Sequence, residues 1–364
     1  MSKEPTTNLL EPYLKIMVEK QAADLYFVTG AKPNMKHIGK TVPISKSFFK
    51  PGQIKKLAYS LLTEEQIEEF ETNQELNLSF GLANLGRFRA NLFIQRSEVS
   101  MVIRYIKGQV PEMDELGLPA VLKNIIMSRT GLVLVVGSTG SGKSTTLASM
   151  LNYRNQRETG HILTIEDPIE FVFRHDKSII SQREVGTDTQ SYENALREAM
   201  RESPEVIMIG EARDRKTLHA AINFADTGHL CLTTLHAVNS NQALDRIMNI
   251  FQTVMREQLF MDLSLNLRAV VSQRLIPSSD GKLDCAVEVM INSPHLSDLI
   301  REGNFNELKE IMEKGETAGM QTFDQSLFDL FTAGRITKKN ALDYADSSTN
   351  LEWKINFGGQ QAQG

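Results

Sequence analysis

An eight-residue segment beginning at Gly137 has the composition of a loop that binds phosphate. It reads Gly137-Ser-Thr-Gly-Ser-Gly-Lys-Ser144 and matches the pattern G-x-x-x-x-G-K-[ST]. Glycines let the backbone fold tightly around phosphate oxygens, and the backbone N–H groups then face the negative charge. In such a loop we expect Lys143 to bridge the β- and γ-phosphates of a nucleotide and Ser144 to hold Mg²⁺.

The sequence on either side of this loop supports the interpretation. An apolar run, Leu132–Val136, leads into the loop, and Thr145–Leu151 leads out of it with the composition of a helix. Strand, loop and helix in that order are what a phosphate site requires, because the helix N-terminus then points at the phosphates. The residues expected to contact ATP are Gly137, Ser138, Thr139, Gly140, Ser141, Gly142, Lys143, Ser144 and Thr145.

Two acidic groups follow later apolar runs. Glu166 begins the segment Glu166-Asp-Pro-Ile-Glu170, and Glu211 follows Val206–Ile209 and Gly210 in a Walker B-like pattern. Ligands of open α/β sheets bind at the carboxyl ends of the strands, and phosphoryl transfer needs carboxylates for magnesium and for the attacking water. A carboxylate after a strand can also be only a helix cap, and the upstream phosphate loop favours the catalytic interpretation.

The segment Thr227–His236 carries two histidines and two strand threonines that could sense the γ-phosphate. We expect His229 and His236 to lie beside Glu211, with a purely structural role as the alternative. A zinc site is not expected, because no third or fourth ligand lies near the two histidines. The chain has only two cysteines, Cys231 and Cys285, which excludes a disulfide framework, and Cys231 is expected in the core.

The first part of the chain predicts a small α/β domain, residues 1–106. Helical spacing of apolar residues covers Leu9–Val18, and a strand pattern follows at Asp24–Val28. A helix with a solvated acidic face is predicted over Ser60–Glu75, and strands over Gly86–Ile94 and Val99–Ile106.

Residues 107–119 are rich in glycine and proline and predict a linker. Four short apolar runs then alternate with helical segments, which predicts a mostly parallel sheet covered by helices, in a domain over residues 120–346. These runs are Leu132–Val136, Ile162–Ile165, Val206–Ile209 and Leu230–Leu235. Helices are expected to dominate from about Gln258 onward. Residues 347–364 are predicted to be a tail, disordered over Gly358–Gly364.

Charge and hydropathy restrict the partners. The 364 residues have a net charge of −5 and an isoelectric point near 5.9. An acidic chain without a basic block disfavours sequence-independent DNA binding, so no direct nucleic-acid partner is expected. No apolar run approaches the ~18 residues of a membrane span, and the N-terminus lacks a signal-peptide core. A cytoplasmic protein is therefore expected.

These motifs together resemble those of secretion and pilus ATPases. The Walker A, Asp box, Walker B and His box correspond to Gly137–Ser144, Glu166–Glu170, Gly210-Glu211 and Thr227–His236. The resemblance narrows to the PilT family of type IV pilus retraction ATPases through Asp24-Leu-Tyr-Phe, Arg87-Phe-Arg89 and Gly319–Ser326. Within that family the chain is most similar to the PilU group, through Tyr153-Arg-Asn155, Thr227–Leu232 and Gln258–Arg268.

The resemblance implies a PAS-like N-terminal domain, a RecA-like ATPase domain with a helical C-terminal part, and a homo-hexameric ring. It implies ATP- and Mg²⁺-dependent pilus disassembly through the inner-membrane platform protein PilC. Glu166 resembles the residue that activates the attacking water, Glu211 the Walker B glutamate near Mg²⁺, and the two histidines the His-box pair. The family has N-domain arginines, some of which reach the nucleotide of a neighbouring subunit. The residues of this chain that resemble them are Arg87, Arg89, Arg96 and Arg104. Which of them reach a neighbouring nucleotide stays open, and a solvated strand face is the alternative.

Several positions depart from the PilT pattern without removing a catalytic group. Ser138 replaces a proline, Ala212 replaces a methionine, and Leu299 begins the segment that reads Ala-Ile-Arg-Glu in PilT. These departures favour an accessory partner of a PilT ring, held at the membrane by protein partners. Two alternatives remain: a regulatory subunit that binds PilT and the platform with hydrolysis secondary, and a related secretion or DNA-transfer ATPase.

Overall fold

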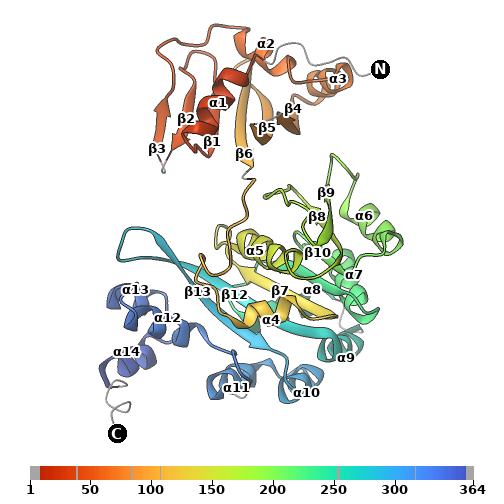
Figure 1. Ribbon diagram of the computed structural model, residues 1–364, viewed down its shortest axis with the longest axis vertical. Coiled ribbons are helices and arrows are strands. Elements are labelled where there is room, and N and C mark those ends of the chain that lie inside the picture. The colour runs from red at the N-terminus through yellow and green to blue at the C-terminus, as the bar shows by residue number, and fades with distance from the viewer. Residues whose placement is uncertain are drawn as a thin grey trace. The chain divides into compact units, whose positions relative to one another are not determined.

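The structure is a computed structural model that describes residues 9–37, 40–82, 85–106, 108–251, 255–315 and 317–357. The chain divides into two compact units (Figure 1). The first contains the residues up to Gln109 together with Glu170–Val172, and the second contains Val110–Ile169 and the residues from Phe173 onward. Among the described residues, no helix combines the length and apolar composition needed to cross a bilayer.

The first unit is built on a six-stranded antiparallel sheet in the order β3-β2-β1-β6-β5-β4. Its strands are β1 (Asp24–Phe27), β2 (Asn34–His37), β3 (Lys40–Pro43), β4 (Glu75–Leu82), β5 (Gly86–Gln95) and β6 (Glu98–Ile106). Its helices are α1 (Glu11–Glu19), α2 (Gln53–Tyr59) and α3 (Glu64–Asn73).

Alternation along β5 separates the two faces of this sheet. Phe88, Ala90 and Leu92 are buried in a core shared with Leu14 and Met17 of α1. The residues between them, including the strand's two arginines, therefore lie on the opposite face. This pattern predicted β5 and β6 correctly, whereas β2, β3 and β4 were not predicted.

The acidic helix is shorter than the predicted span Ser60–Glu75. Helix α3 begins at Glu64 because Thr63 caps it: the Thr63 hydroxyl accepts from the backbone of Gln66, and the Gln66 side chain accepts from the backbone N–H of Thr63. The residues before Thr63 therefore lie outside the helix, and α2 precedes them as a separate helix.

The second unit is built on a seven-stranded sheet in the order β13-β12-β7-β11-β10-β8-β9 (Figure 1). All neighbouring strands are parallel except β12 and β13. The strands are β7 (Gly131–Gly137), β8 (Gly160–Glu166), β9 (Ser178–Glu184), β10 (Val206–Ile209), β11 (Leu230–Leu235), β12 (Leu267–Pro277) and β13 (Leu283–Ile291). The α-helices are α4 (Val121–Ile126), α5 (Lys143–Asn155), α6 (Tyr192–Ala199), α7 (Arg215–Asp226), α8 (Ser240–Ile250), α9 (Arg256–Asn266), α10 (Pro294–Glu302), α11 (Leu308–Lys314), α12 (Phe323–Thr332), α13 (Lys338–Asp343) and α14 (Ser348–Phe357). Short 3₁₀ helices are η1 (Met200–Glu202) and η3 (Phe305–Glu307).

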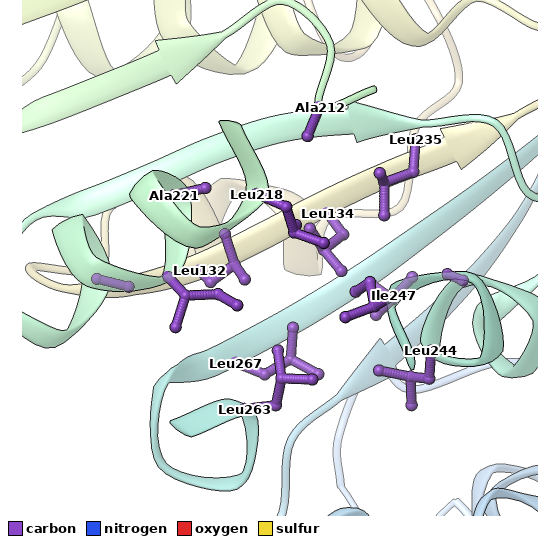
Figure 2. Packing of buried hydrophobic residues seen from close by; sticks show 14 of the residues in the cluster. Leu132, Leu134, Ala212, Leu218, Ala221, Leu235, Leu244, Ile247, Leu263 and Leu267 are labelled. Carbon is purple, nitrogen blue, oxygen red and sulfur yellow. The ribbon is translucent and has the colours of Figure 1, made fainter. Parts of the chain in front are cut away.

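The core of this unit packs helices onto the central strands. Figure 2 shows Leu132 and Leu134 of β7 beside Leu218 of α7 and Ile247 of α8, all within one buried cluster. Every residue of β7 and β11 is buried, as expected for strands covered on both faces. The four predicted strands and the mostly parallel sheet are thus confirmed, and Cys231 is fully buried in the core.

The expectation that helices dominate after Gln258 is wrong in one region. Strands β12 and β13 occupy Leu267–Pro277 and Leu283–Ile291 and extend the sheet past β7. Most of β12 is buried on both faces, so its sequence has no period of two by which it could be told from a buried helix. Within the predicted tail, Ser348–Phe357 forms α14, and Gly358–Gly364 lie outside the described residues.

Candidate functional site

The predicted phosphate loop connects β7 to α5, and close packing shapes its first residue. A side chain at Gly137 would meet the Ser141 hydroxyl and would place its Cβ 2.7 Å from the backbone oxygen of Gln273. Glycine is therefore required at that position. Gly142 precedes α5 with a φ of +93°, a left-handed conformation that glycine adopts without strain.

Lys143 is held over the loop by backbone oxygens. Its Nζ donates to the carbonyl of Gly137 at 2.8 Å and to that of Ser138 at 2.9 Å. The residue is only 9% exposed, and burial lowers the pKa of the ammonium group while the charge of Glu211 opposes that shift. The ammonium group thus lies within the loop that a phosphate would enter.

The remaining loop residues divide by exposure. Ser138, Thr139, Gly140 and Ser144 are exposed, so their polar groups can meet a ligand. Ser141 is buried, and among the described residues its hydroxyl finds no hydrogen-bond partner.

Gln273 supports the loop from β12 and was not predicted. It pairs in register with Gly137, and its Nε2 donates to the Thr146 hydroxyl on α5 at 2.8 Å. No local motif marks Gln273, because its position depends on a strand that the sequence did not predict.

Glu166 ends β8 and is 6% exposed. Its Oε1 accepts a hydrogen bond from the Thr164 hydroxyl at 2.6 Å and another from Gln182 Nε2 at 3.2 Å. A carboxylate held in one direction in this way can accept a proton from a correctly placed water.

Glu211 follows β10 at the same edge of the sheet. The preceding residue, Gly210, donates its N–H to Ile165 O at 2.8 Å and accepts from the Thr234 hydroxyl at 2.7 Å. These bonds fix the end of β10 between β8 and β11 and bring Glu211 close in space to the end of β8.

Basic side chains contact both oxygens of the Glu211 carboxylate. His236 Nε2 lies 2.9 Å from Oε1, and Arg213 approaches Oε2 at 2.8 Å through both Nε and a terminal nitrogen. The Glu211 side chain is 17% exposed, so the carboxylate remains accessible from solvent. The expected neighbourhood of His236 and Glu211 is therefore present, and Arg213 is an addition that the sequence did not single out.

His229 lies at the opposite end of β11. It precedes the strand, whereas His236 follows it, and its Nδ1 is 3.1 Å from the carbonyl oxygen of Phe224. The expectation that both histidines lie beside Glu211 within one chain is wrong for His229, because the whole of β11 separates them.

Tyr192 on α6 closes the space around the two strand ends. A Cβ at Gly210 would lie 3.1 Å from its hydroxyl, so a larger residue at position 210 would require Tyr192 to shift. Burial, followed by the negative charge of Asp167, raises the pKa of the Tyr192 phenol above its usual range. Tyr192 therefore stays protonated and can donate a hydrogen bond near the site.

Three of the four predicted arginines share one face of the first unit's sheet. Arg89 of β5 pairs in register with Arg104 of β6, and Arg87 lies two residues away on the same face. Arg104 Nε donates to the buried carboxylate of Asp24 at 2.8 Å, and this bond raises the pKa of the guanidinium group. Arg96 lies apart from them, in the turn that joins β5 to β6.

The oxygen ligands predicted for Mg²⁺ suit that ion in type. Mg²⁺ prefers hard oxygen ligands and is usually held by one or two protein groups together with phosphates and water. Ser144 offers an exposed hydroxyl in the first turn of α5, and Glu211 offers a partly exposed carboxylate.

The phosphate loop between β7 and α5, with acidic groups at the ends of β8 and β10 in a mostly parallel sheet, defines a RecA-like P-loop nucleotide-binding domain. Residues 2–322 match the family described as Type II/IV secretion system protein, and the chain belongs to that family.

Two relatives and one solved structure indicate the branch. The chain is 47% identical over 351 residues to the type IV pilus ATPase PilU of Pseudomonas aeruginosa, covering 96% of this chain and 92% of the relative. It is 38% identical over 338 residues to the type IV pilus retraction ATPase PilT of the same organism, covering 93% and 98%. The structure of the pilus retraction motor PilT with bound ADP matches 95% of this chain and 99% of its own, with 40% identity and a TM-score of 0.89. The chain is therefore an ATP-hydrolysing enzyme of the type IV pilus ATPase group.

Proposed function

We propose that this chain is a Mg²⁺-dependent motor ATPase of pilus retraction that works as an accessory partner of a PilT ring. The observation that carries the proposal is the sheet edge where the phosphate loop and Lys143 meet two differently held carboxylates, Glu166 and Glu211. A pure scaffold would not need these groups together.

Each side chain then has a distinct task in hydrolysis. The loop N–H groups and Lys143 bind the β- and γ-phosphates, with Lys143 exchanging its two carbonyl partners for phosphate oxygens. Ser144 and Glu211 would hold Mg²⁺, which neutralises phosphate charge when bound. Glu166 accepts the proton of the attacking water. His236, which follows β11, contacts the Glu211 carboxylate and holds it near the end of that strand.

The N-domain arginines act across subunit boundaries in a homo-hexameric ring. A guanidinium group from a neighbouring subunit stabilises charge that develops on the γ-phosphate. Arg87, Arg89 and Arg104 share one face and are the favoured donors, and Arg96 would act at a different place because it occupies a turn. His229, at the far end of β11, would contribute only at a subunit interface.

The proposed partners follow from the relatives. The curated relatives named PilU and PilT are pilus ATPases, and we extend to this chain a role beside a PilT ring and the platform protein PilC. The ring would sit at the cytoplasmic face of the inner membrane, held by these proteins and without direct nucleic-acid binding.

ATP turnover by the purified chain, with and without PilT, tests this proposal. We expect magnesium-dependent turnover that Glu166→Gln reduces by ~10²–10⁴-fold while ATP binding persists. A wild-type chain that binds PilT but does not turn over ATP would support the regulatory subunit instead.

Mixed rings test the arginines. Subunits with Lys143→Ala lack a working phosphate loop but keep their arginines, and subunits with Arg89→Ala and Arg104→Ala have the reverse defect. Mixing them under conditions of subunit exchange should restore part of the turnover, because intact loops then face intact arginines. No restored activity would contradict action across the interface.

The accessory role is tested in cells. Expression of this chain in cells that lack PilT should not restore full pilus retraction, whereas co-expression with PilT should increase it. Full retraction without PilT would identify an independent motor.

A further inference from the structure

We infer that Thr164 and Gln182 are positioning residues that fix the direction of the water-activating carboxylate Glu166. This inference rests on the proposed role of Glu166 as the group that activates water. It states that two residues, on the adjacent strands β8 and β9, set the direction of the Glu166 carboxylate. The hydrogen bonds from Thr164 and Gln182 both reach the same carboxylate oxygen, Oε1.

The sheet geometry brings the three side chains together. Thr164 and Gln182 are direct partners in the parallel pairing of β8 with β9, so their side chains lie on the same face. Glu166 lies two residues beyond Thr164 and shares that face. The donors therefore reach the carboxylate from its own strand and from the adjacent strand.

A second hydrogen bond orients the Gln182 amide. The backbone N–H of Phe173 donates to Gln182 Oε1 at 2.9 Å. Since a backbone N–H can only donate, the amide oxygen must face Phe173, and the amide NH₂ group must face Glu166. Gln182 thus connects the chain that follows the Asp box to the carboxylate.

Burial makes these contacts specific. Thr164 is fully buried and Glu166 is 6% exposed, so bulk water competes little for either group. Two donors on one oxygen restrict rotation about the last side-chain bond of Glu166. That restriction sets the direction of the other oxygen and holds the group in the geometry that proton transfer needs.

Matched variants separate positioning from folding. Thr164→Val keeps the shape and removes the hydroxyl, whereas Thr164→Ser keeps the hydroxyl. Gln182→Leu has a similar volume and removes the donor to Glu166 together with the acceptor for Phe173, without placing a second charge beside Glu166. We expect Thr164→Val and Gln182→Leu each to lower kcat by about tenfold or more with unchanged ATP affinity, and Thr164→Ser to restore most of the rate.

A double-mutant cycle with Glu166→Gln provides the decisive readout. If Thr164 and Gln182 act through Glu166, their variants should cause little further loss of hydrolysis in the Glu166→Gln enzyme. The same fold loss in that background, or a Thr164→Ser enzyme as slow as Thr164→Val, would overturn the inference while leaving Glu166 as the base. Wild-type turnover by Glu166→Gln alone would instead refute the proposed function, and the positioning role would fall with it.

Discussion

Two carboxylates at one edge of the same sheet are held in opposite ways. Glu166, at the end of β8, is buried and accepts from a neutral hydroxyl and a neutral amide. Glu211, after β10, is partly exposed and contacts a guanidinium group and an imidazole ring. Neutral donors orient a carboxylate without cancelling its charge, whereas ion pairing ties its position to the charges around it. The first environment suits a proton acceptor, and the second suits a group that responds to magnesium and phosphate.

The largest effect on ATP turnover is expected for Lys143, the lysine of the phosphate loop. Lys143→Ala should lower ATP turnover by at least about 10³-fold, because it removes the charged phosphate contact and leaves the core intact. Lys123→Ala is a matched control in the same unit, since Lys123 pairs with the exposed Asp114 and lies near the Tyr153 ring. Normal turnover by a folded Lys143→Ala protein, judged by circular dichroism, would remove the phosphate-loop assignment.

A smaller effect on turnover is expected from Arg213, which contacts Glu211. Arg213→Ala removes the bidentate contact to Glu211 Oε2 and should lower turnover by about tenfold, with a higher magnesium requirement. Because the Arg213 side chain is 66% exposed, the free energy of unfolding should hardly change. Arg213→Lys should be intermediate, since a lysine cannot reproduce the planar fork. If the magnesium dependence of turnover is the same in Arg213→Ala as in the wild type, Arg213 does not act through Glu211.

The smallest effect concerns a third carboxylate, which serves as a control for Glu166. Glu288 is 3% exposed and, like Glu166, accepts from neutral donors: the Ser240 backbone and hydroxyl and the Ser272 hydroxyl. Burial raises the pKa of Glu288, so the folded protein binds its proton more tightly than the unfolded chain does. The contribution of Glu288 to stability should therefore fall as pH rises above the ordinary glutamate pKa.

Glu288→Gln keeps an acceptor for the same donors and removes the titration. At about pH 8 we expect this variant to be more stable than the wild type by about 0.5–1 kcal/mol in urea unfolding, with no advantage near pH 4. Its ATP turnover should be unchanged. A variant that is less stable at the higher pH, or that loses turnover, would contradict this assignment.

Sequence patterns predicted the parts of the site that are local in the chain. The phosphate loop, both acids and His236 could be placed because each follows a continuous apolar strand. His229 could not, since seven residue steps of about 3.3 Å each, along and into β11, separate it from His236 by roughly 23 Å. Thr164, Gln182 and Gln273 were missed because their roles come from pairing between strands, which no spacing within one segment reveals.

Parallel measurements on Glu166→Gln and Glu211→Gln test the difference between the two carboxylates most directly. ATP binding, with and without magnesium, and single-turnover hydrolysis should be measured for both proteins. Glu166→Gln should bind ATP like the wild type under both conditions and hydrolyse it ~10²–10⁴-fold more slowly. Glu211→Gln should lose the part of ATP affinity that depends on magnesium and keep the rest. The reverse assignment, with magnesium-dependent binding lost in Glu166→Gln and retained in Glu211→Gln, would contradict the roles given to the two strand ends.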